Sequence, residues 1–332
     1  MKVLLTGGFG NIGYETVKHL LEKGHGVRCL DLDTKANRRT AREFKGRVET
    51  FWGDVTNRED VEAAVKGQDV VVHLAFVLDV MWSEFYLKEA RKINVGGTAN
   101  VIEAMKARLP QGQRLIFISS VGVYGKTQHL RPPLKVSDPV NPSTVYAQHK
   151  IECEEMVKNS GLEWSIFRLT FAPTIRPSNL DMVYVLFGLP LDHRIDFVDP
   201  RDVGLAIANS LTSGEAWHKT LLIGGGPRNQ ILYSEFVKVA LGYLGQFPEG
   251  AFAPSGTSPP IDWVDSNESQ RILSYQNLTL RDFVEAQQAA LGPGRYLIPL
   301  VAPLVRRWML QQSPFYRYYK RGKRQQESHR AR

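Results

Sequence analysis

Short apolar runs alternate with stretches of helical periodicity through the first half of the chain. Between the first two runs, Val17, Leu20 and Leu21 share one helical face, and Gly24 ends the helix. Such alternation is typical of a doubly wound α/β fold, in which helices cover both faces of a parallel sheet. The apolar runs predict six strands, at Lys2–Thr6, Val27–Asp31, Val48–Gly53, Asp69–Leu74, Arg114–Ser119 and Trp164–Leu169.

The pattern becomes irregular and rich in proline after Thr170. Before Thr170, longer amphipathic stretches predict helices over Ser83–Arg108 and Ser143–Asn159. After Thr170, the pattern predicts a helix near Asp202–Leu211 and a strand at Leu221–Ile223. Residues 245–260, rich in Gly, Pro and Ser, predict a surface loop. We therefore expect three parts: a nucleotide-binding domain of residues 1–169 to which 195–223 return, a smaller substrate-binding region of 170–194 and 224–294, and a tail of 295–332.

A glycine-rich turn, Thr6-Gly7-Gly8-Phe9-Gly10-Asn11-Ile12-Gly13, stands directly between the first strand and the first helix. Gly7 permits the tight turn, Gly10 lets the backbone approach a pyrophosphate, and Gly13 allows the helix to pack close to the strand. The first helical amides, including those of Asn11 and Ile12, would face the phosphates. The turn predicts a dinucleotide site in a Rossmann fold, with an ordinary glycine-rich turn as the alternative.

Carboxylates after the second and third strands indicate which dinucleotide binds. Asp31 lies 18 residues after Gly13, near the usual interval for a carboxylate that binds the adenosine ribose. Its charge would repel a 2′-phosphate, so NAD is favoured over NADP. Asp33 could take the same role, and Arg28, Arg38 and Arg39 keep NADP open. Asp54 and Val55 are placed to meet the adenine edge, or form a simple turn.

Tyr146 and Lys150 stand four residues apart on a predicted helix and would share one face. A phenol is a poor proton donor at neutral pH, and a neighbouring ammonium lowers its pKa by stabilising phenolate. Hydride transfer to a carbonyl needs such a proton partner. Ser119 and Ser120 follow a strand upstream, where a hydroxyl would point into the cofactor crevice. The alternatives are a solvated helix face for Tyr146 and Lys150 and a strand cap for the serines. His149 points off the face of the pair and is expected to be solvated.

These pieces together resemble the extended short-chain dehydrogenase/reductase family, of the NAD-dependent epimerase/dehydratase type, over about residues 1–290. The resemblance implies that Tyr146 is the general acid/base and that Lys150 lowers its pKa and binds the nicotinamide ribose. It implies that Ser120, rather than Ser119, orients the substrate oxygen, and that the two long helices pair with their copies in a homodimer. The matching segments are the glycine-rich turn, Gly53-Asp54-Val55, His73-Leu74-Ala75 beside the cofactor, Asn94 to Thr98 with Asn94 as the ordering asparagine, Ser119 to Gly125, Tyr146 with Lys150, and Phe197 to Val203 as the return segment.

The resemblance fails where the substrate is recognised. The stretch from Arg168 to Pro173 lacks the asparagine with which sugar-nucleotide members of the family hold a diphosphate. Met182–Phe187 is strongly apolar and forms either core or the wall of a pocket for an apolar substrate. We therefore expect an NAD-dependent oxidoreductase acting at a carbon that bears oxygen. The alternatives are a nucleotide-sugar epimerase or dehydratase and a noncatalytic dinucleotide-binding sensor or assembly subunit.

The positive charge of the chain is concentrated at its end. The net charge is +8, and residues 295–332 alone hold ten Lys or Arg and one Glu, which leaves the rest at −1. A basic groove for nucleic acid is therefore not expected. The tail combines an apolar stretch, Leu297–Leu310, with aromatic and basic residues, so it either contacts an anionic membrane surface or packs on the protein.

The content of cysteine and histidine argues against disulfides and metals. Only Cys29 and Cys153 are present, which favours a reducing compartment and predicts a cytoplasmic protein with two structural thiols, at most peripheral to a membrane. The eight histidines are scattered, with no pair at helical spacing beside a carboxylate. We expect no metal site.

Overall fold

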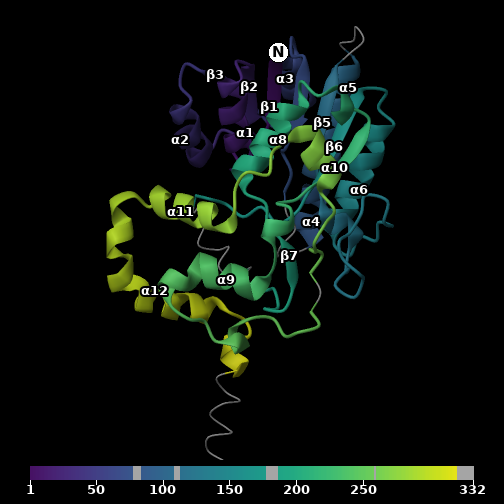
Figure 1. The fold of residues 1–332 in the computed structure, drawn as a ribbon. Coiled ribbons are helices and arrows are strands. Elements are labelled where there is room, and N and C mark those ends of the chain that lie inside the picture. The colour runs from purple at the N-terminus through teal and green to yellow at the C-terminus, as the bar shows by residue number, and fades with distance from the viewer. Residues whose placement is uncertain (78–83, 108–112, 177–185, 258, 320–332) are drawn as a thin grey trace, which may run out of the picture.

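A seven-stranded parallel sheet lies at the centre of the molecule, in the order β3-β2-β1-β4-β5-β6-β8 (Figure 1). The computed structural model describes residues 1–77, 84–107, 113–176, 186–257 and 259–319. The predicted doubly wound fold is confirmed, and the first six strands lie within one residue of their expected bounds. The strands are β1 (Lys2–Thr6), β2 (Gly26–Asp31), β3 (Val48–Trp52), β4 (Val70–His73), β5 (Arg114–Ser120), β6 (Glu163–Leu169) and β8 (Lys219–Ile223).

The strands bury both of their faces. In β1, Val3 and Leu5 enter one hydrophobic cluster, whereas Leu4, between them, enters a second cluster on the other face. All three are fully buried, as the period of two in a strand requires when helices cover both faces. The first face is covered by α1 (Asn11–Glu22), α8 (Pro200–Ser210) and α10 (Asn267–Leu273), and the second by α3 (Arg58–Val65), α5 (Gly97–Lys106) and α6 (Val145–Lys158).

The two long predicted helices are present, one of them with an irregularity. Helix α6 begins after Thr144, whose side chain accepts the amide of Ala147. The helix expected at 83–108 is a helical run from 84 to 106, in which a π-helical turn (Lys92–Gly96) joins α4 (Glu84–Arg91) to α5. The sequence pattern does not predict this turn, which buries Asn94.

A third hydrophobic cluster lies outside the sheet and gathers residues between Ile175 and Leu310. Phe187 is fully buried there, and the rest of the apolar stretch at 182–185 lies outside the described residues. The expectation of a surface loop at 245–260 is wrong for its middle, because Phe252 enters this cluster and is 3% exposed. The elements in this region are β7 (Arg194–Asp196), paired antiparallel with β9 (Gln230–Leu232), and α9 (Tyr233–Leu241), α11 (Leu280–Ala290) and α12 (Ile298–Gln312), while α2 (Lys35–Glu43) lies beside the main sheet (Figure 1).

The apolar stretch before the basic end forms α12. Met309 and Leu310 are buried in the third cluster, so part of this stretch packs on the protein. Pro303 lies inside the helix, whereas Pro299 occupies its first turn, where no intrahelical amide bond is lost. Within the described ranges, none of the helices has the length and apolar character needed to cross a membrane.

Candidate active site

The turn between β1 and α1 requires residues without side chains at Gly7 and Gly13. Gly7 has a φ of +72°, in the left-handed region, and a Cβ on Gly13 would lie 2.3 Å from the carbonyl oxygen of Gly7. Gly10 is the N-cap of α1 and provides no side-chain bond to the first helical amides, which include those of Asn11 and Ile12. The start of this helix therefore fits an anionic group such as a pyrophosphate.

Asp31, at the end of β2, is tied to the same turn. Its Oδ2 accepts the amide of Phe9 at 3.0 Å, and its Oδ1 accepts the amide of Leu32 and the side chain of Asn37, each at 2.9 Å. Burial raises the pKa of Asp31, against the two backbone hydrogen bonds, which lower it. The alternative acid, Asp33, instead pairs with Arg38 at the surface.

The residues after β3 form a turn. Asp54 Oδ1 accepts the amide of Thr56 at 2.8 Å, which is the simpler of the two roles expected for Asp54. Val55 is buried and packs on Gly97, where a Cβ would lie 2.9 Å from the valine. The carbonyl oxygen of Val55 accepts the side chain of Asn100 at 2.9 Å, so this turn is fixed to α5.

The segment after β4 is organised by the hydroxyl of Thr6, which sequence reasoning did not single out. Thr6 Oγ1 accepts the amides of Leu74 and Ala75, each at 3.2 Å, and lies 2.7 Å from His73 Nδ1. His73 Nε2 lies 3.0 Å from the hydroxyl of Thr98, which itself donates to a carbonyl, so Nε2 carries the proton. Burial, reinforced by nearby Lys150, lowers the pKa of His73 to about 3, and the ring is neutral.

Asn94 holds the chain just beyond this segment. Its Oδ1 accepts the amide of Val77 at 2.8 Å, and its Nδ2 donates to the carbonyl of Val77 at 3.0 Å. The same amide lies 3.4 Å from His149 Nδ1. His149 is 5% exposed, so the expectation that it is solvated is wrong, because the ring packs inward against the π-helical turn.

The two serines at the end of β5 have different surroundings. Ser119 is buried and donates to Glu154 Oε1 at 2.6 Å. Ser120 is half-buried, and its hydroxyl oxygen accepts the amide of Gly122 at 3.1 Å. Ser120 therefore acts as an acceptor in its bond with Gly122 and keeps its hydroxyl hydrogen for another partner. The hydroxyl hydrogen of Ser119 is already donated to Glu154.

Lys150 lies beneath a cover of aromatic rings. Its ammonium donates to the carbonyl of Ile118 at 2.6 Å and lies 3.3 Å from the centre of the Phe76 ring and 5.5 Å from that of Tyr146. The rings of Phe76 and Tyr146 meet edge to face at 5.5 Å. Burial lowers the pKa of Lys150 to about 7. Tyr146 and Lys150 thus lie together beside β5, where Lys150 binds Ile118, two residues before Ser120.

A buried ion pair fixes α6 to the sheet behind these residues. Arg168 donates through Nε and one terminal nitrogen to the two carboxylate oxygens of Glu154, at 2.9 and 2.6 Å. Its other terminal nitrogen donates to the hydroxyl of Tyr124 at 2.7 Å. Because Ser119 also binds Glu154, the pair joins α6, β5 and β6. Sequence reasoning missed it, although both residues stand in segments that it singled out.

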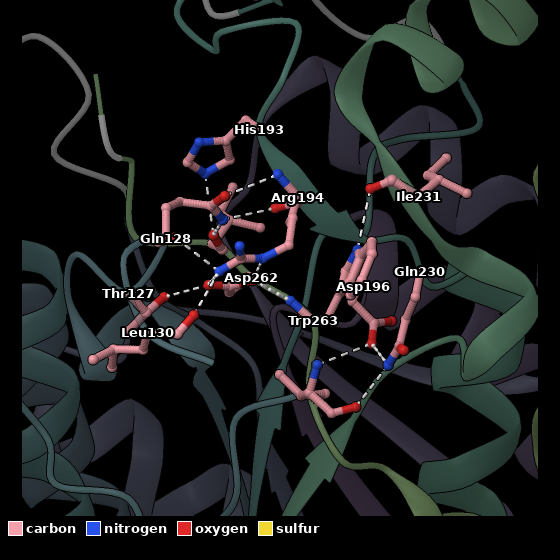
Figure 2. A network of polar contacts seen from close by, with 12 residues as sticks. Thr127, Gln128, Leu130, His193, Arg194, Asp196, Gln230, Ile231, Asp262 and Trp263 are labelled. Atoms are coloured by element: carbon pink, nitrogen blue, oxygen red, sulfur yellow. Dashed lines mark hydrogen bonds and ion pairs between the residues drawn. The ribbon is translucent and has the colours of Figure 1, made fainter. Parts of the chain in front are cut away.

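A second polar network joins the loop after Tyr124 to β7, and Figure 2 shows how its side chains converge on Asp262. Arg194 donates to both oxygens of Asp262, at 2.8 and 2.9 Å, and Thr127 donates to Oδ2 at 3.0 Å. Gln128 exchanges hydrogen bonds with the backbone of Arg194, at 3.0 and 3.1 Å. Asp262 is 1% exposed, so its charge is balanced inside the protein by Arg194.

The described part of the chain brings no group of three or more His, Cys, Asp or Glu together in a geometry for metal. What meets at the carboxyl ends of the parallel strands is the glycine-rich turn, Asp31, the Leu74–Ala75 segment and the end of β5 with Lys150. This edge is where open α/β sheets bind ligands. The residues suit a dinucleotide, since an amide-rich helix start lies beside a carboxylate.

The sequence is similar to steroid dehydrogenases and sugar epimerases over at most about half of its length. A 3-beta-hydroxysteroid dehydrogenase of Mycolicibacterium neoaurum is 35% identical over 126 residues, which cover 37% of this chain and 32% of the relative. A putative UDP-glucose 4-epimerase of Methanocaldococcus jannaschii is 32% identical over 172 residues, 50% of this chain and 54% of the relative. The chain thus spans only about a third to about half of these relatives' lengths.

The fold is shared with solved structures over most of the chain. A UDP-glucuronic acid 4-epimerase of Bacillus cereus, solved with UDP-glucuronic acid and NAD, matches 88% of this chain and 99% of its own, with a TM-score of 0.74 and 22% identity. A UDP-glucose 4-epimerase of Bifidobacterium longum matches 88% and 98%, with a TM-score of 0.72 and 21% identity. The profile of one sequence family matches residues 3–180, which are more than half of this chain. The chain therefore belongs to the NAD dependent epimerase/dehydratase family.

Proposed function

We propose that this protein is an NAD-dependent oxidoreductase that transfers hydride at a carbon bearing oxygen. The observation that carries the proposal is the burial of Lys150 beside Tyr146 at the end of β5. A lysine that is 3% exposed and held by a backbone carbonyl is poorly explained as a solvated helix face. The family membership of the chain and the dehydrogenases among its relatives support the same conclusion.

The proposed roles follow from the surroundings of each side chain. Tyr146 holds the proton at its phenolic oxygen, gives it to the substrate oxygen during reduction and takes it back during oxidation. Lys150 provides positive charge beside the phenol and binds the nicotinamide ribose. Ser120, whose hydroxyl hydrogen is free of the Gly122 bond, orients the substrate oxygen. When bound, NAD supplies the carbon centre that accepts or returns the hydride.

We assign the cofactor site to the glycine-rich turn and to the strand ends beside it. The uncapped start of α1 would hold the pyrophosphate, and the Asp31 carboxylate would bind the adenosine ribose. Asp31 lies against the turn, where a carboxylate would repel a 2′-phosphate, and this supports NAD over NADP. The further residues that we assign to the cofactor are Gly7, Gly10, Asn11, Ile12, Gly13, Asp54, Val55, Leu74, Ala75 and Asn94.

We propose that the substrate is uncharged and apolar. Residues 168–201, which comprise the first part of the proposed substrate region and the residues on either side of it, contain four arginines and no lysine. Each arginine is neutralised by a carboxylate: Arg168 by Glu154, Arg176 by Glu43, Arg194 by Asp262 and Arg201 by Asp199. A diphosphate would find no unpaired cation in the described part of this segment. The alternative is a nucleotide-sugar epimerase or dehydratase, which is supported by the similarity of the chain to UDP-sugar epimerases.

The substitution Tyr146→Phe tests the proposal. It removes the transferable proton and should lower turnover by about 10² to 10⁴ while NAD binding stays nearly intact. Tyr243→Phe, at a half-exposed tyrosine of the third cluster region, is the matched control and should leave turnover unchanged. The assay compares apolar alcohols and ketones with nucleotide sugars. Bound NAD without turnover of either class would favour a noncatalytic sensor, and normal turnover of Tyr146→Phe would reject the mechanism.

We further propose a cytoplasmic homodimer that contacts a membrane peripherally through residues 295–332. Two free, buried thiols, Cys29 and Cys153, support a reducing compartment. The helical run 84–106 packs beside α6, joined by a bidentate pair of Arg91 and Glu152 at 2.7 and 2.6 Å, which supports a joint dimerisation surface. A strictly monomeric species in light scattering at micromolar concentration would contradict the dimer.

A further inference from the structure

Helix α12 exposes apolar side chains on the side opposite to the one that packs on the protein. Ala302 and Met309 lie on its inner side, where they are 7% and 6% exposed and belong to the third cluster. On the outer side, Leu300 is 77% exposed and Leu304, one turn later, is 70% exposed. Residues four apart lie on one helix face, so the two leucines form a stripe.

Two neighbours widen this stripe into a patch. Val301 is 41% exposed, and Tyr296, in the turn before the helix, is 70% exposed. A surface helix normally turns polar side chains outward, and an apolar patch that faces water marks a site of interaction. We call Tyr296, Leu300, Val301 and Leu304 the outer patch of α12.

Positive charge follows the outer patch along the chain. Arg307 is exposed three residues after Leu304, and Arg317 is exposed after the helix ends. Residues 295–332 carry ten basic side chains against the single acid Glu327. In Figure 1, α12 lies at the end of the molecule away from the main sheet and from the N-terminus. An apolar patch continued by cations fits an anionic lipid surface, where cations remain at the phosphates.

We propose that the outer patch of α12 docks on an anionic membrane surface, with the helix in the plane of the interface. Leu300, Val301 and Leu304 enter the boundary of the acyl chains, and Arg307 and Arg317 bind lipid phosphates. The helix has 15 residues, fewer than the roughly 20 that span a bilayer. Charge decides against a second copy of the chain as the occupant, because two segments of net charge +9 would repel each other.

Sedimentation of the full chain with vesicles tests this docking surface without substrate or NAD, so the result is independent of catalysis. One set of vesicles contains phosphatidylcholine alone, and the other contains phosphatidylcholine mixed with phosphatidylglycerol. The double variant Leu300→Gln with Leu304→Gln removes the apolar stripe without adding charge. We expect wild-type protein to sediment with the anionic vesicles, and the double variant to partition at least about tenfold less.

One control variant and one test of the cations make the assignment specific. Leu130→Gln with Leu291→Gln changes two leucines that are 45% and 38% exposed elsewhere, and it should bind as wild type does. Arg307→Gln with Arg317→Gln should weaken binding to the anionic vesicles, as should added salt. Unfolding midpoints verify that each variant is folded.

Three outcomes would overturn the proposal. The first is wild-type protein that remains in the supernatant with both vesicle types. The second is a double variant of the stripe that still binds as wild type does. The third is a wild-type oligomer, measured by sedimentation velocity without lipid, that the double variant dissociates, because a second copy would then cover the patch.

Discussion

The ammonium nitrogen of Lys150 lies 3.3 Å from the centre of the Phe76 ring. A ring face attracts a cation, but it also excludes the water that would otherwise solvate the charge. The hydrogen bond to the carbonyl of Ile118 replaces only one of three such partners. The effect of burial therefore exceeds that of the ring and the carbonyl, and it lowers the pKa of Lys150 to about 7. At about pH 7, half of the molecules carry the charge.

Substitution of Phe76 tests whether its ring keeps the pKa of Lys150 low. In Phe76→Ala, water reaches the ammonium, and the pKa of Lys150 should rise from about 7 toward its ordinary value. NMR titration of protein with ¹³C-labelled lysine side chains measures this value directly. Phe76→Leu, which keeps an apolar cover, should retain a low pKa. An unchanged pKa in Phe76→Ala would mean that Phe117, 4.9 Å from the nitrogen, suffices for the effect.

The same shift makes the stability of the wild type depend on pH. Between about pH 7 and about pH 10 the unfolded chain holds a proton on Lys150 that the folded chain has lost, so the free energy of unfolding rises with pH. Lys150→Met should lack this contribution and should be the more stable protein below about pH 7, because methionine needs no charge in the core. Urea unfolding of both proteins across this range measures the difference, and parallel stability curves would contradict the assignment.

Asp31 should set the preference between the two dinucleotides. Wild-type protein should bind NAD more tightly than NADP, because the carboxylate repels a 2′-phosphate. Asp31→Asn keeps an acceptor for the amide of Phe9 but removes the charge, and it should narrow the difference between the two affinities. Titrations followed by protein fluorescence measure both constants. Asp192→Asn, at an exposed aspartate two residues before β7, is the control, and tighter binding of NADP by the wild type would refute this role.

Neighbouring glutamates of α6 should differ greatly in their contribution to stability. Glu154→Gln leaves Arg168 buried without its counter-charge and should lower the free energy of unfolding by about 3 to 5 kcal/mol. Glu155 makes only an exposed pair with Lys158, so Glu155→Gln should cost less than about 1 kcal/mol. Urea unfolding of the two variants gives the comparison. Equal losses would show that the buried pair is not what anchors α6.

The fold could be predicted from sequence because its main sheet is built from local signals. Each strand is a short apolar run, and the turn at Gly7 to Gly13 demands residues without side chains. The order of Ser120, Tyr146 and Lys150 along the chain indicated the candidate site in the same way. The choice of Ser120 over Ser119 came from the family resemblance.

The surroundings of these residues could not be predicted, because they depend on partners distant in the sequence. Phe76, in the segment after β4, covers Lys150 from 74 positions away, and Asp262 neutralises Arg194 across 68 positions. The π-helical turn that buries Asn94 is a single turn, too short to have a periodic signal of its own. His149 is buried beside that turn, against the side chain of Asn94.

Strand β8 enters the sheet only after the chain has left it to form β7. It pairs with β6 through Ser165 to Leu169, and its Leu221 and Ile223 complete the cluster on the first face. A protein cut after residue 180, where the family match ends, would keep the whole glycine-rich turn and Lys150 but would present the bare edge of β6 to other chains. During synthesis about fifty further residues must therefore be added after β6 before β8 can cover its edge. In that period association with a chaperone or with another copy would compete with folding.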